Sequence, residues 1–226
     1  MFKSKILLSE FVTHNVKRFI IEKPANYKFI PGQATDFAIN LPGWEDKIHS
    51  FTFTSLNSDL VLEFTIKGYP KNEFPSHSGM TEKLHSLKPG DEVLIGDPWG
   101  TINYMGKGVF IAGGAGITPF IAILRDLKSK DEINGNKLVF SNNYQKDIIL
   151  EQEFKEMFAP KDLFLTLTKE NAPGYFSEKI TVSFLNKYLK NFNDNFYICG
   201  PKQMVEDLMG ILVTLGAKTE SVVFEE

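Results

Sequence analysis

The chain has 226 residues, of which 42% are hydrophobic, so it can bury one or two packed cores and is not a wholly disordered protein. Its formal net charge of −3 gives no basic excess that would favour nucleic acid or an anionic membrane surface. The single cysteine, Cys199, excludes an intramolecular disulfide and a metal centre built on several cysteines, and a reducing cytoplasm is the compartment that fits it best.

The N-terminal segment shows no targeting signal. Residues 1–10 lack the apolar core and the cleavage site of a signal peptide. The longest uncharged apolar stretch, 108–124, is interrupted by glycines and a proline and is shorter than the roughly 20 residues that a membrane-spanning helix needs. We therefore expect a cytoplasmic protein without a membrane span.

The first half, residues 1–105, has the pattern of short strands separated by turns. The strand-like stretches are 16–23, 34–41, 49–56, 60–68 and 91–98, and turn pairs such as Pro31-Gly32 and Pro89-Gly90 lie between them. Within 60–68 the residues alternate, with Glu63 and Thr65 on the polar side, which predicts one buried and one exposed face. Several strands at about this spacing predict an antiparallel β-barrel or sandwich.

From residue 106 onward, strands alternate with helices. Strands are expected at 108–113, 137–142, 163–168, 195–200 and 221–226, and helices at 118–130, 147–158, 181–190 and 201–216. The first of these strands is almost wholly apolar, as in a parallel sheet that is covered on both faces. The alternation predicts an α/β domain with a doubly wound parallel sheet.

A glycine-rich turn, residues 113–116, joins the first strand of this half to its first helix. Thr118 suits the N-cap of the helix and Pro119 its first position. Glycines let a backbone approach a ligand closely, and the start of a helix favours a phosphate. Alone, the turn is equally well explained as a tight connection that binds nothing. Its place at the end of a strand in an α/β sheet favours a nucleotide site.

A second junction of strand, turn and helix follows at residues 197–201. Cys199 is expected at the carboxyl end of its strand, where ligand sites of open α/β sheets collect. A single buried cysteine is usually a small hydrophobic residue. Beside the glycine turn on the same edge of the sheet, Cys199 is also a candidate for lining a cofactor.

Six motifs follow one another in a familiar order. They are "FIPGQATDF" (29–37), "HSFTFTS" (49–55), "SGMTEKL" (78–84), "LKPGDEVLIGDPWG" (87–100), "IAGGAGITPF" (111–120) and "ICGPKQM" (198–204). Through them nearly the whole chain resembles the ferredoxin/flavodoxin–NAD(P)H reductase family, including its cytochrome-reductase branch. The resemblance implies an FAD-binding β-barrel over 1–105 and an NAD(P)H-binding α/β domain over 106–226.

The resemblance also implies roles for residues of the barrel. The hydroxyl of Thr52 would bond to flavin N5, and Phe51 would lie against the flavin ring. His49 stands where the family has an arginine that pairs with the flavin phosphates, and histidine carries neither its permanent charge nor its bidentate fork. The expected flavin-binding residues are His49, Ser50, Phe51, Thr52, Ile66, Lys67, Tyr69, Ser78, Gly79, Met80 and Thr81.

Four members of this set also have plain structural explanations. His49 facing solvent, with the phosphates held elsewhere, is one alternative. A simple helix cap explains Thr81, and an exposed strand end explains Lys67 and Tyr69 equally well. His77 and His85 have no partner at metal-ligand spacing, so no metal site is expected.

For the second half the resemblance implies a nicotinamide nucleotide site. The expected residues are Gly113, Gly114, Gly116, Ile117, Thr118, Asn142, Asn143, Cys199, Gly200, Pro201 and Met204. Cys199 would orient the nicotinamide ring, which makes Thr52 and Cys199 the two residues expected at the reacting atoms. Asn142 and Asn143 are neutral, and Lys146 is the only base nearby, so NADH is favoured over NADPH.

The implied function is an NAD(P)H-dependent flavoprotein reductase that passes a hydride to bound FAD and then electrons to a one-electron carrier: a flavodoxin, a ferredoxin or a haem protein. Two alternatives are open. The chain could reduce free flavin and release it, which the missing arginine favours. It could instead be a non-catalytic nucleotide-binding or electron-transfer subunit of a partner enzyme.

Overall fold

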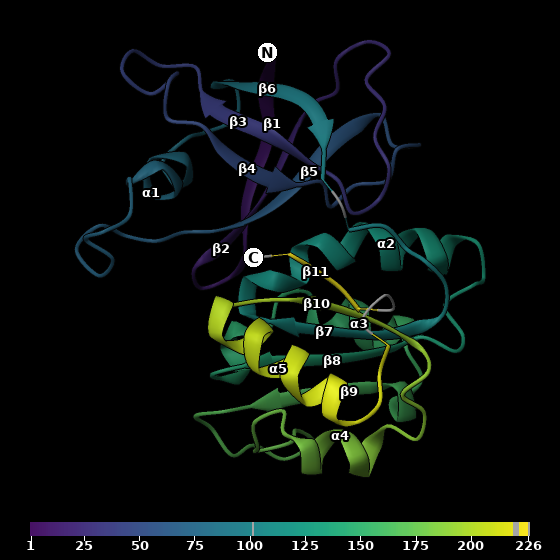
Figure 1. Cartoon of the computed structure of the whole chain (residues 1–226). Coiled ribbons are helices and arrows are strands. Elements are labelled where there is room, and N and C mark those ends of the chain that lie inside the picture. The colour runs from purple at the N-terminus through teal and green to yellow at the C-terminus, as the bar shows by residue number, and fades with distance from the viewer. Residues whose placement is uncertain (101, 219–221, 226) are drawn as a thin grey trace. The chain divides into compact units, whose positions relative to one another are not determined.

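Two separate β-sheets, one antiparallel and one parallel, organise the chain (Figure 1). The structure is a computed structural model that describes residues 1–100, 102–218 and 222–225, the last four by their backbone only. By contacts the chain divides into unit 1, Met1–Thr101 with Thr118–Arg125, and unit 2, Ile102–Ile117 with Asp126–Glu226.

The antiparallel sheet of unit 1 closes on itself as a barrel. Its strands are β1 (Phe2–Thr13), β2 (Val16–Glu22), β3 (Ala34–Ile39), β4 (His49–Thr52), β5 (Val61–Lys67) and β6 (Glu92–Trp99), in the order β4-β3-β6-β1-β2-β5. Just after β4, the N–H of Thr54 donates to the carbonyl oxygen of Glu63 in β5 at 2.8 Å, which joins the two ends of the sheet. The predicted barrel is therefore confirmed, and a short helix, α1 (Met80–His85), follows β5.

Aromatic side chains fill the barrel. Phe19, Phe37, Phe53 and Phe64 are each 0% exposed, and the rings of Phe29 and Phe53 stack with centroids 4.2 Å apart. Full burial of such a side chain stabilises a fold by about 1.5–3 kcal/mol relative to exposure. These rings explain why strands this short form a stable unit.

Two strands differ from the sequence expectation. The longest strand, β1, was not predicted, because exposed Leu7 and Phe11 obscure the alternation that buried Ser4 and Ile6 begin. In β5 the expected polar face is not exposed: Glu63 and Thr65 are 8% and 5% exposed, respectively. That prediction was wrong because the polar side chains of β5 find buried partners in distant segments.

The parallel sheet of unit 2 carries helices on both faces. In its described part the strands are β7 (Gly108–Gly113), β8 (Lys137–Asn142), β9 (Leu163–Leu167), β10 (Asn195–Cys199) and β11 (Val222–Glu225), in the order β11-β10-β7-β8-β9. The helices are η1 (Gly114–Ile117), α2 (Thr118–Ser129), η2 (Gln145–Asp147), α3 (Glu151–Met157), η3 (Pro160–Asp162), α4 (Val182–Tyr188) and α5 (Lys202–Thr214).

Packing shows how the two faces of this sheet are covered. Phe184 of α4 and Leu208 of α5 belong to one buried cluster with Val109 and Ile111 of β7. On the opposite face, Phe154 of α3 lies edge-on to Phe140 of β8, with ring centroids 6.2 Å apart. The predicted doubly wound parallel sheet is therefore confirmed.

One helix is shorter than expected. The stretch 147–158 was predicted as a single helix, but α3 begins only at Glu151. Before it, Asp147 accepts the N–H of Tyr144 at 3.1 Å and closes a separate 3₁₀ turn, and Leu150 adopts a left-handed conformation with φ of 52°. A left-handed residue interrupts helical hydrogen bonding, so the segment divides there.

Among the described residues, no helix is long and apolar enough to cross a bilayer. The same residues contain no group of three or more histidine, cysteine, aspartate or glutamate side chains that could hold a metal ion.

Candidate functional site

The short strand β4 presents the first group of predicted site residues. Phe51 packs partly against the barrel core, edge-on to Phe37 with ring centroids 5.4 Å apart. The ring of His49 lies parallel to that of Phe51, at 6.5 Å and an interplanar angle of 15°. Thr52, the last residue of the strand, is half-buried. The last two residues of the strand therefore provide an aromatic ring and a hydroxyl.

Ser50 has a different partner from its neighbours in β4. Its hydroxyl donates to Oδ1 of Asp36 at 3.2 Å, and the indole N–H of Trp99 donates to the same oxygen at 3.1 Å. The side chain of Ser50 is therefore used within the barrel.

His49 connects β4 to the segment before α1. Its Nε2 lies 2.8 Å from Oγ of Ser78, which also accepts the N–H of Met80 at 3.2 Å. Gly79 between them has a φ of 81°, a conformation that side chains rarely adopt, and the only atom near its missing Cβ is the Lys71 Cδ at 3.8 Å. The turn before α1 is therefore built on a glycine and held by the histidine that replaces the expected arginine.

Thr81 does not cap α1, because the N-cap is Gly79 and no side chain makes a cap hydrogen bond there. Its Oγ1 accepts the N–H of Tyr69 at 3.1 Å, which leaves the proton of the hydroxyl available to donate. The ring of Tyr69 stacks on that of His77 at 4.6 Å, and Nζ of Lys67 lies 5.4 Å from the Tyr69 centroid. Burial raises the pKa of Tyr69, so its hydroxyl stays a neutral hydrogen-bonding group. Tyr69 is thus more ordered than a plain exposed strand end.

Two residues of the sequence argument have structural partners instead. The side chain of Ile66 is 2% exposed in the barrel core, and its carbonyl oxygen lies 2.9 Å from Nε2 of His85. Desolvation lowers the pKa of His85, which favours a neutral ring that donates this hydrogen bond. Gly68 makes room for the ring, because a Cβ there would lie 2.8 Å from it.

In unit 2 the two predicted turns pack directly against each other. A Cβ on Gly113 would lie 2.4 Å from Sδ of Met204, and one on Gly116 would lie 2.4 Å from the carbonyl oxygen of Cys199. These two glycines are therefore needed for the close packing of one turn against the other. Gly114 differs: its φ is +53° and nothing lies within 4 Å of its missing Cβ.

The start of α2 is displaced by one residue from the prediction. The N-cap is Ile117, not Thr118, because the 3₁₀ turn of η1 runs directly into the helix and Ile117 is already helical, with φ of −69° and ψ of −22°. Pro119 occupies the first turn, as expected. The side chain of Ile117 is fully buried, so only its backbone can meet a ligand.

Cys199 ends β10 opposite Ala112 of β7 and is partly exposed. Gly200 and Pro201 continue from it into α5, and Gly200 also lies against Gly113. The carboxyl ends of β7 and β10 therefore bring the glycine turn and the Cys199 turn together.

Asn142 is the last residue of β8, the strand next to β7. Its side chain is 5% exposed, and neither Oδ1 nor Nδ2 has a hydrogen-bond partner. A buried amide left unpaired costs about 1–3 kcal/mol, so both atoms are available to a polar group from outside the chain. Asn143 is exposed, and its Oδ1 accepts the hydroxyl of Thr168 at 3.0 Å.

Two charged groups near these sites were missed from the sequence. The N–H of Gln145 donates to Glu170 at 2.7 Å, which places a carboxylate beside the Asn143 loop. In unit 1, Arg125 pairs with Glu63 at 2.6 Å. Arg125 directly follows the apolar stretch 108–124, and that position was the available signal.

The residues of each unit fit the group expected there. Unit 1 offers a hydroxyl, an aromatic ring and a glycine turn. A threonine hydroxyl at this turn has a proton available to donate. Unit 2 offers an open left-handed glycine, a thiol and a buried unpaired amide at one edge of a parallel sheet. His49 and Ser78 form a Ser–His contact in unit 1, but among the described residues neither set contains the Ser–His–Asp triad used in hydrolysis. Such sets suit redox chemistry that cofactors carry.

Comparisons with known proteins agree with this geometry. A family model described as the oxidoreductase NAD-binding domain matches residues 110–209. NADH-cytochrome b5 reductase 1 of Kluyveromyces lactis is 30% identical over 226 residues, covering 91% of this chain and 76% of that protein. The human NADH-cytochrome b5 reductase 1 is 29% identical over 239 residues, covering 89% and 77%.

Solved structures share the fold over almost the whole chain. The ferredoxin NADP+ reductase from Neisseria gonorrhoeae with bound FAD and NADP has a TM-score of 0.84 at 19% identity, covering 99% of this chain and 97% of that one. The cytochrome b5 reductase domain of Ulva prolifera nitrate reductase has a TM-score of 0.85 at 19% identity, covering 99% and 96%.

Proposed function

The chain belongs to the ferredoxin reductase-like family of flavin oxidoreductases that includes the NADH-cytochrome b5 reductases, and we propose that it transfers electrons from NADH through bound FAD to a one-electron carrier protein. It is an NAD(P)H-dependent flavoprotein reductase, with FAD and a nicotinamide nucleotide as cofactors. This membership favours an enzyme over a non-catalytic subunit.

The two halves divide the work. Residues 1–105 hold FAD, and residues 106–226 hold the nicotinamide nucleotide. When bound, FAD supplies the chemistry that links a two-electron hydride transfer from the nicotinamide to one-electron transfers. The protein contributes binding and orientation.

In the barrel, Thr52 offers its hydroxyl to flavin N5, and Phe51 lies against the flavin ring. What supports this is the half-buried position of Thr52 at the end of β4 and the packing of Phe51 on Phe37. A hydrogen bond at N5 orients the ring without any acid–base pair.

The flavin phosphates are held by the segment from Ser78 to Thr81. Its backbone N–H groups follow a left-handed glycine, and Thr81 can donate its hydroxyl proton. His49, through Ser78, supplies a hydrogen bond in place of a permanent cation. We infer that the main chain provides most of the grip on the phosphates.

The buried amide of Asn142 is the observation that carries the nucleotide half of the proposal. Both of its polar atoms lack a partner at the carboxyl end of β8, and ribose hydroxyls could satisfy them. Gly114 leaves space for phosphate, and Cys199, whose carbonyl oxygen lies against Gly116, would orient the nicotinamide ring.

NADH is the proposed substrate rather than NADPH. Asn142 and Asn143 are neutral, Glu170 adds a negative charge nearby, and a 2′-phosphate would need a cation. Steady-state kinetics test this: a lower KM and higher turnover with NADPH would reject it.

The acceptor is a flavodoxin, a ferredoxin or a haem protein. Relatives named NADH-cytochrome b5 reductases favour the haem protein among these three. Anaerobic titration of the purified, FAD-loaded protein with NADH should bleach the flavin absorbance, and a competent carrier added next should restore it. Flavin that stays oxidised under excess NADH would reject the proposal.

Reduction of free flavin is the second candidate. His49 in place of the family arginine favours weaker retention of the flavin. Absorbance of the freshly purified protein separates the two functions, because stoichiometric FAD supports electron transfer and colourless protein supports release of reduced flavin.

A further inference from the structure

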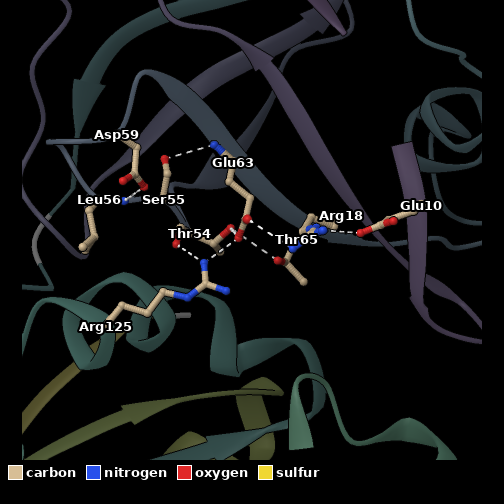
Figure 2. A network of polar contacts seen from close by, with 9 residues as sticks. All are labelled: Glu10, Arg18, Thr54, Ser55, Leu56, Asp59, Glu63, Thr65 and Arg125. Carbon is tan, nitrogen blue, oxygen red and sulfur yellow. Dashed lines mark hydrogen bonds and ion pairs between the residues drawn. The ribbon is translucent and has the colours of Figure 1, made fainter. Parts of the chain in front are cut away.

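A partly buried guanidinium, that of Arg125, binds the segment just after β4 and strand β5 beside the proposed flavin site (Figure 2). Nη1 of Arg125 donates to the carbonyl oxygen of Thr54 at 2.7 Å and to Oε1 of Glu63 at 2.6 Å. The side chains of Arg125 and Glu63 are 20% and 11% exposed, respectively. We name these three residues the Arg125 clamp.

The clamp satisfies every polar group of Thr54. The hydroxyl of Thr54 donates to Oε1 of Glu63 at 2.9 Å, and its N–H donates to the Glu63 carbonyl oxygen at 2.8 Å. Its own carbonyl oxygen is the one that Arg125 binds. The next residue, Ser55, accepts the N–H of Glu63 at 3.0 Å. Hydrogen bonds of both backbone and side chain therefore hold the chain just after β4 in place.

A second arginine balances the buried carboxylate less closely. Nη1 of Arg18 lies 3.9 Å from Oε2 of Glu63, and its Nη2 pairs with the more exposed Glu10. Arg125 is thus the nearer of the two cations, and Figure 2 shows it entering from α2 while Arg18 comes from the barrel.

Stability alone is a weak reason for this arrangement. The desolvation of two buried charges offsets most of their attraction, and a buried ion pair is often replaceable by apolar residues at no cost. What such a pair provides is one defined position for the segments that it joins. Here it joins the chain after β4 to the first half of α2, residues 118–125, which belong to the same unit as the barrel.

Both joined segments carry residues of the proposed site. Thr52 precedes Thr54 by two residues, and α2 begins at Thr118 directly after the glycine turn. We propose that Arg125 is a positioning residue for hydride transfer, which fixes Thr52 and the start of α2 by holding Thr54 and Glu63. This inference rests on the proposed function and adds a residue that touches neither cofactor.

The test compares Arg125→Met and the neutral double variant Glu63→Gln/Arg125→Met with the wild type, all loaded with FAD. The double variant leaves no unpaired buried carboxylate and is the one expected to fold well. Lys130→Met is the matched control, since it removes the cation of an exposed ion pair with Asp126 on the same helix.

Stopped-flow reduction of the flavin by saturating NADH is the main measurement. Because small misplacements of reacting groups are costly, we expect both variants to be reduced about tenfold more slowly or worse. FAD affinity should stay within about twofold of wild type, as expected for groups that do not touch the cofactor. Lys130→Met should match the wild type. Hydrogen–deuterium exchange should also rise at the peptide that contains Thr54.

Other outcomes would overturn the inference. These are wild-type reduction rates in a folded double variant, loss of FAD in proportion to activity, or failure of both variants to fold, which would assign the clamp to stability alone. If the wild-type protein is not reduced by NADH, the proposed function fails instead. The exchange measurement at Thr54 then still decides whether the clamp orders this segment.

Discussion

Nε2 of His49 lies 2.8 Å from Oγ of Ser78, so a histidine of β4 holds the turn that begins α1. The family arginine would bring a permanent charge to this place, and the observed pair brings only a hydrogen bond. The grip on the flavin phosphates should therefore be weaker than in relatives with arginine and open to improvement.

We predict that His49→Arg binds FAD about tenfold more tightly, because a charge-assisted hydrogen bond is worth about 1.5–3 kcal/mol. His49→Ala should bind FAD more weakly than the wild type. Quenching of flavin fluorescence during titration of the apoprotein measures both. His14→Gln, at an exposed histidine, is the control and should change nothing. Equal affinities for wild type and His49→Ala would place the phosphates elsewhere.

The hydroxyl of Thr52 gives the second prediction. Thr52→Val should slow flavin reduction by NADH about tenfold, since one hydrogen bond of about 1.5 kcal/mol is lost at the reacting ring. Thr52→Ser keeps the hydroxyl and should stay close to wild type. FAD content should be the same in both variants. If Thr52→Val is reduced as fast as Thr52→Ser, the hydroxyl has no part in orienting the flavin.

The glycine turn of unit 2 contains one glycine that is needed for packing and another that borders open space, so the two needs can be tested separately. Gly116→Ala should lower the free energy of unfolding by about 1–3 kcal/mol, because its Cβ would overlap the Cys199 carbonyl oxygen. Gly114→Ala meets no atom and should cost only about 1 kcal/mol for its left-handed backbone. Chemical denaturation measures both values. A smaller loss for Gly116→Ala than for Gly114→Ala would contradict the packing seen here.

The partly buried ring of His85 makes the barrel sensitive to acid. Its pKa is lowered by desolvation, so the unfolded chain binds this proton more readily than the folded one. The stability contributed by the neutral ring is present above the ordinary pKa of 6.5 and is lost as pH falls through the lower folded value. We expect denaturation curves of His85→Gln to depend less on pH below 6.5 than those of the wild type. A parallel pH dependence in both would show that other groups dominate.

Local patterns predicted some parts of this fold well. The strand β7 runs from Gly108 to Gly113 as expected, because an apolar run between glycines leaves little choice of ends. The parallel sheet followed from such runs and from their spacing. For the first half the spacing left a barrel and a sandwich both open, and the family resemblance implied the barrel. Conversely, Glu63 looked like a solvent-facing residue, since its partner Arg125 lies 62 residues away and only the tertiary fold brings the two together.

The candidate site shows the same division. Motifs identified His49, Thr52 and Cys199 as positions of interest. The sequence could not show that Gly116 serves a neighbouring turn, because that need arises from the approach of Cys199 in space. Nor could it show that the amide of Asn142 is buried without a partner. Close approach between atoms and unpaired buried polar groups arise only in the folded chain, and each can be tested by substitution.

Asn142 allows the sharpest of these tests, because stability and binding should move in opposite directions. Asn142→Leu replaces an unpaired buried amide by an apolar side chain of similar size, which removes a desolvation cost without leaving a cavity. Without nucleotide, the variant should therefore be as stable as the wild type or more stable in thermal denaturation. With nucleotide, it should have a KM for NADH raised about tenfold, as expected for the loss of hydrogen bonds worth about 1.5 kcal/mol.

Asn143→Leu is the matched control, because Asn143 is exposed and its Oδ1 already accepts the hydroxyl of Thr168. It should raise the KM less than Asn142→Leu does and should not increase stability. A destabilised Asn142→Leu protein with an unchanged KM would mean that the amide serves the fold and not the nucleotide. The buried amide would then no longer support the nucleotide half of the proposed function, whatever the outcome at the barrel.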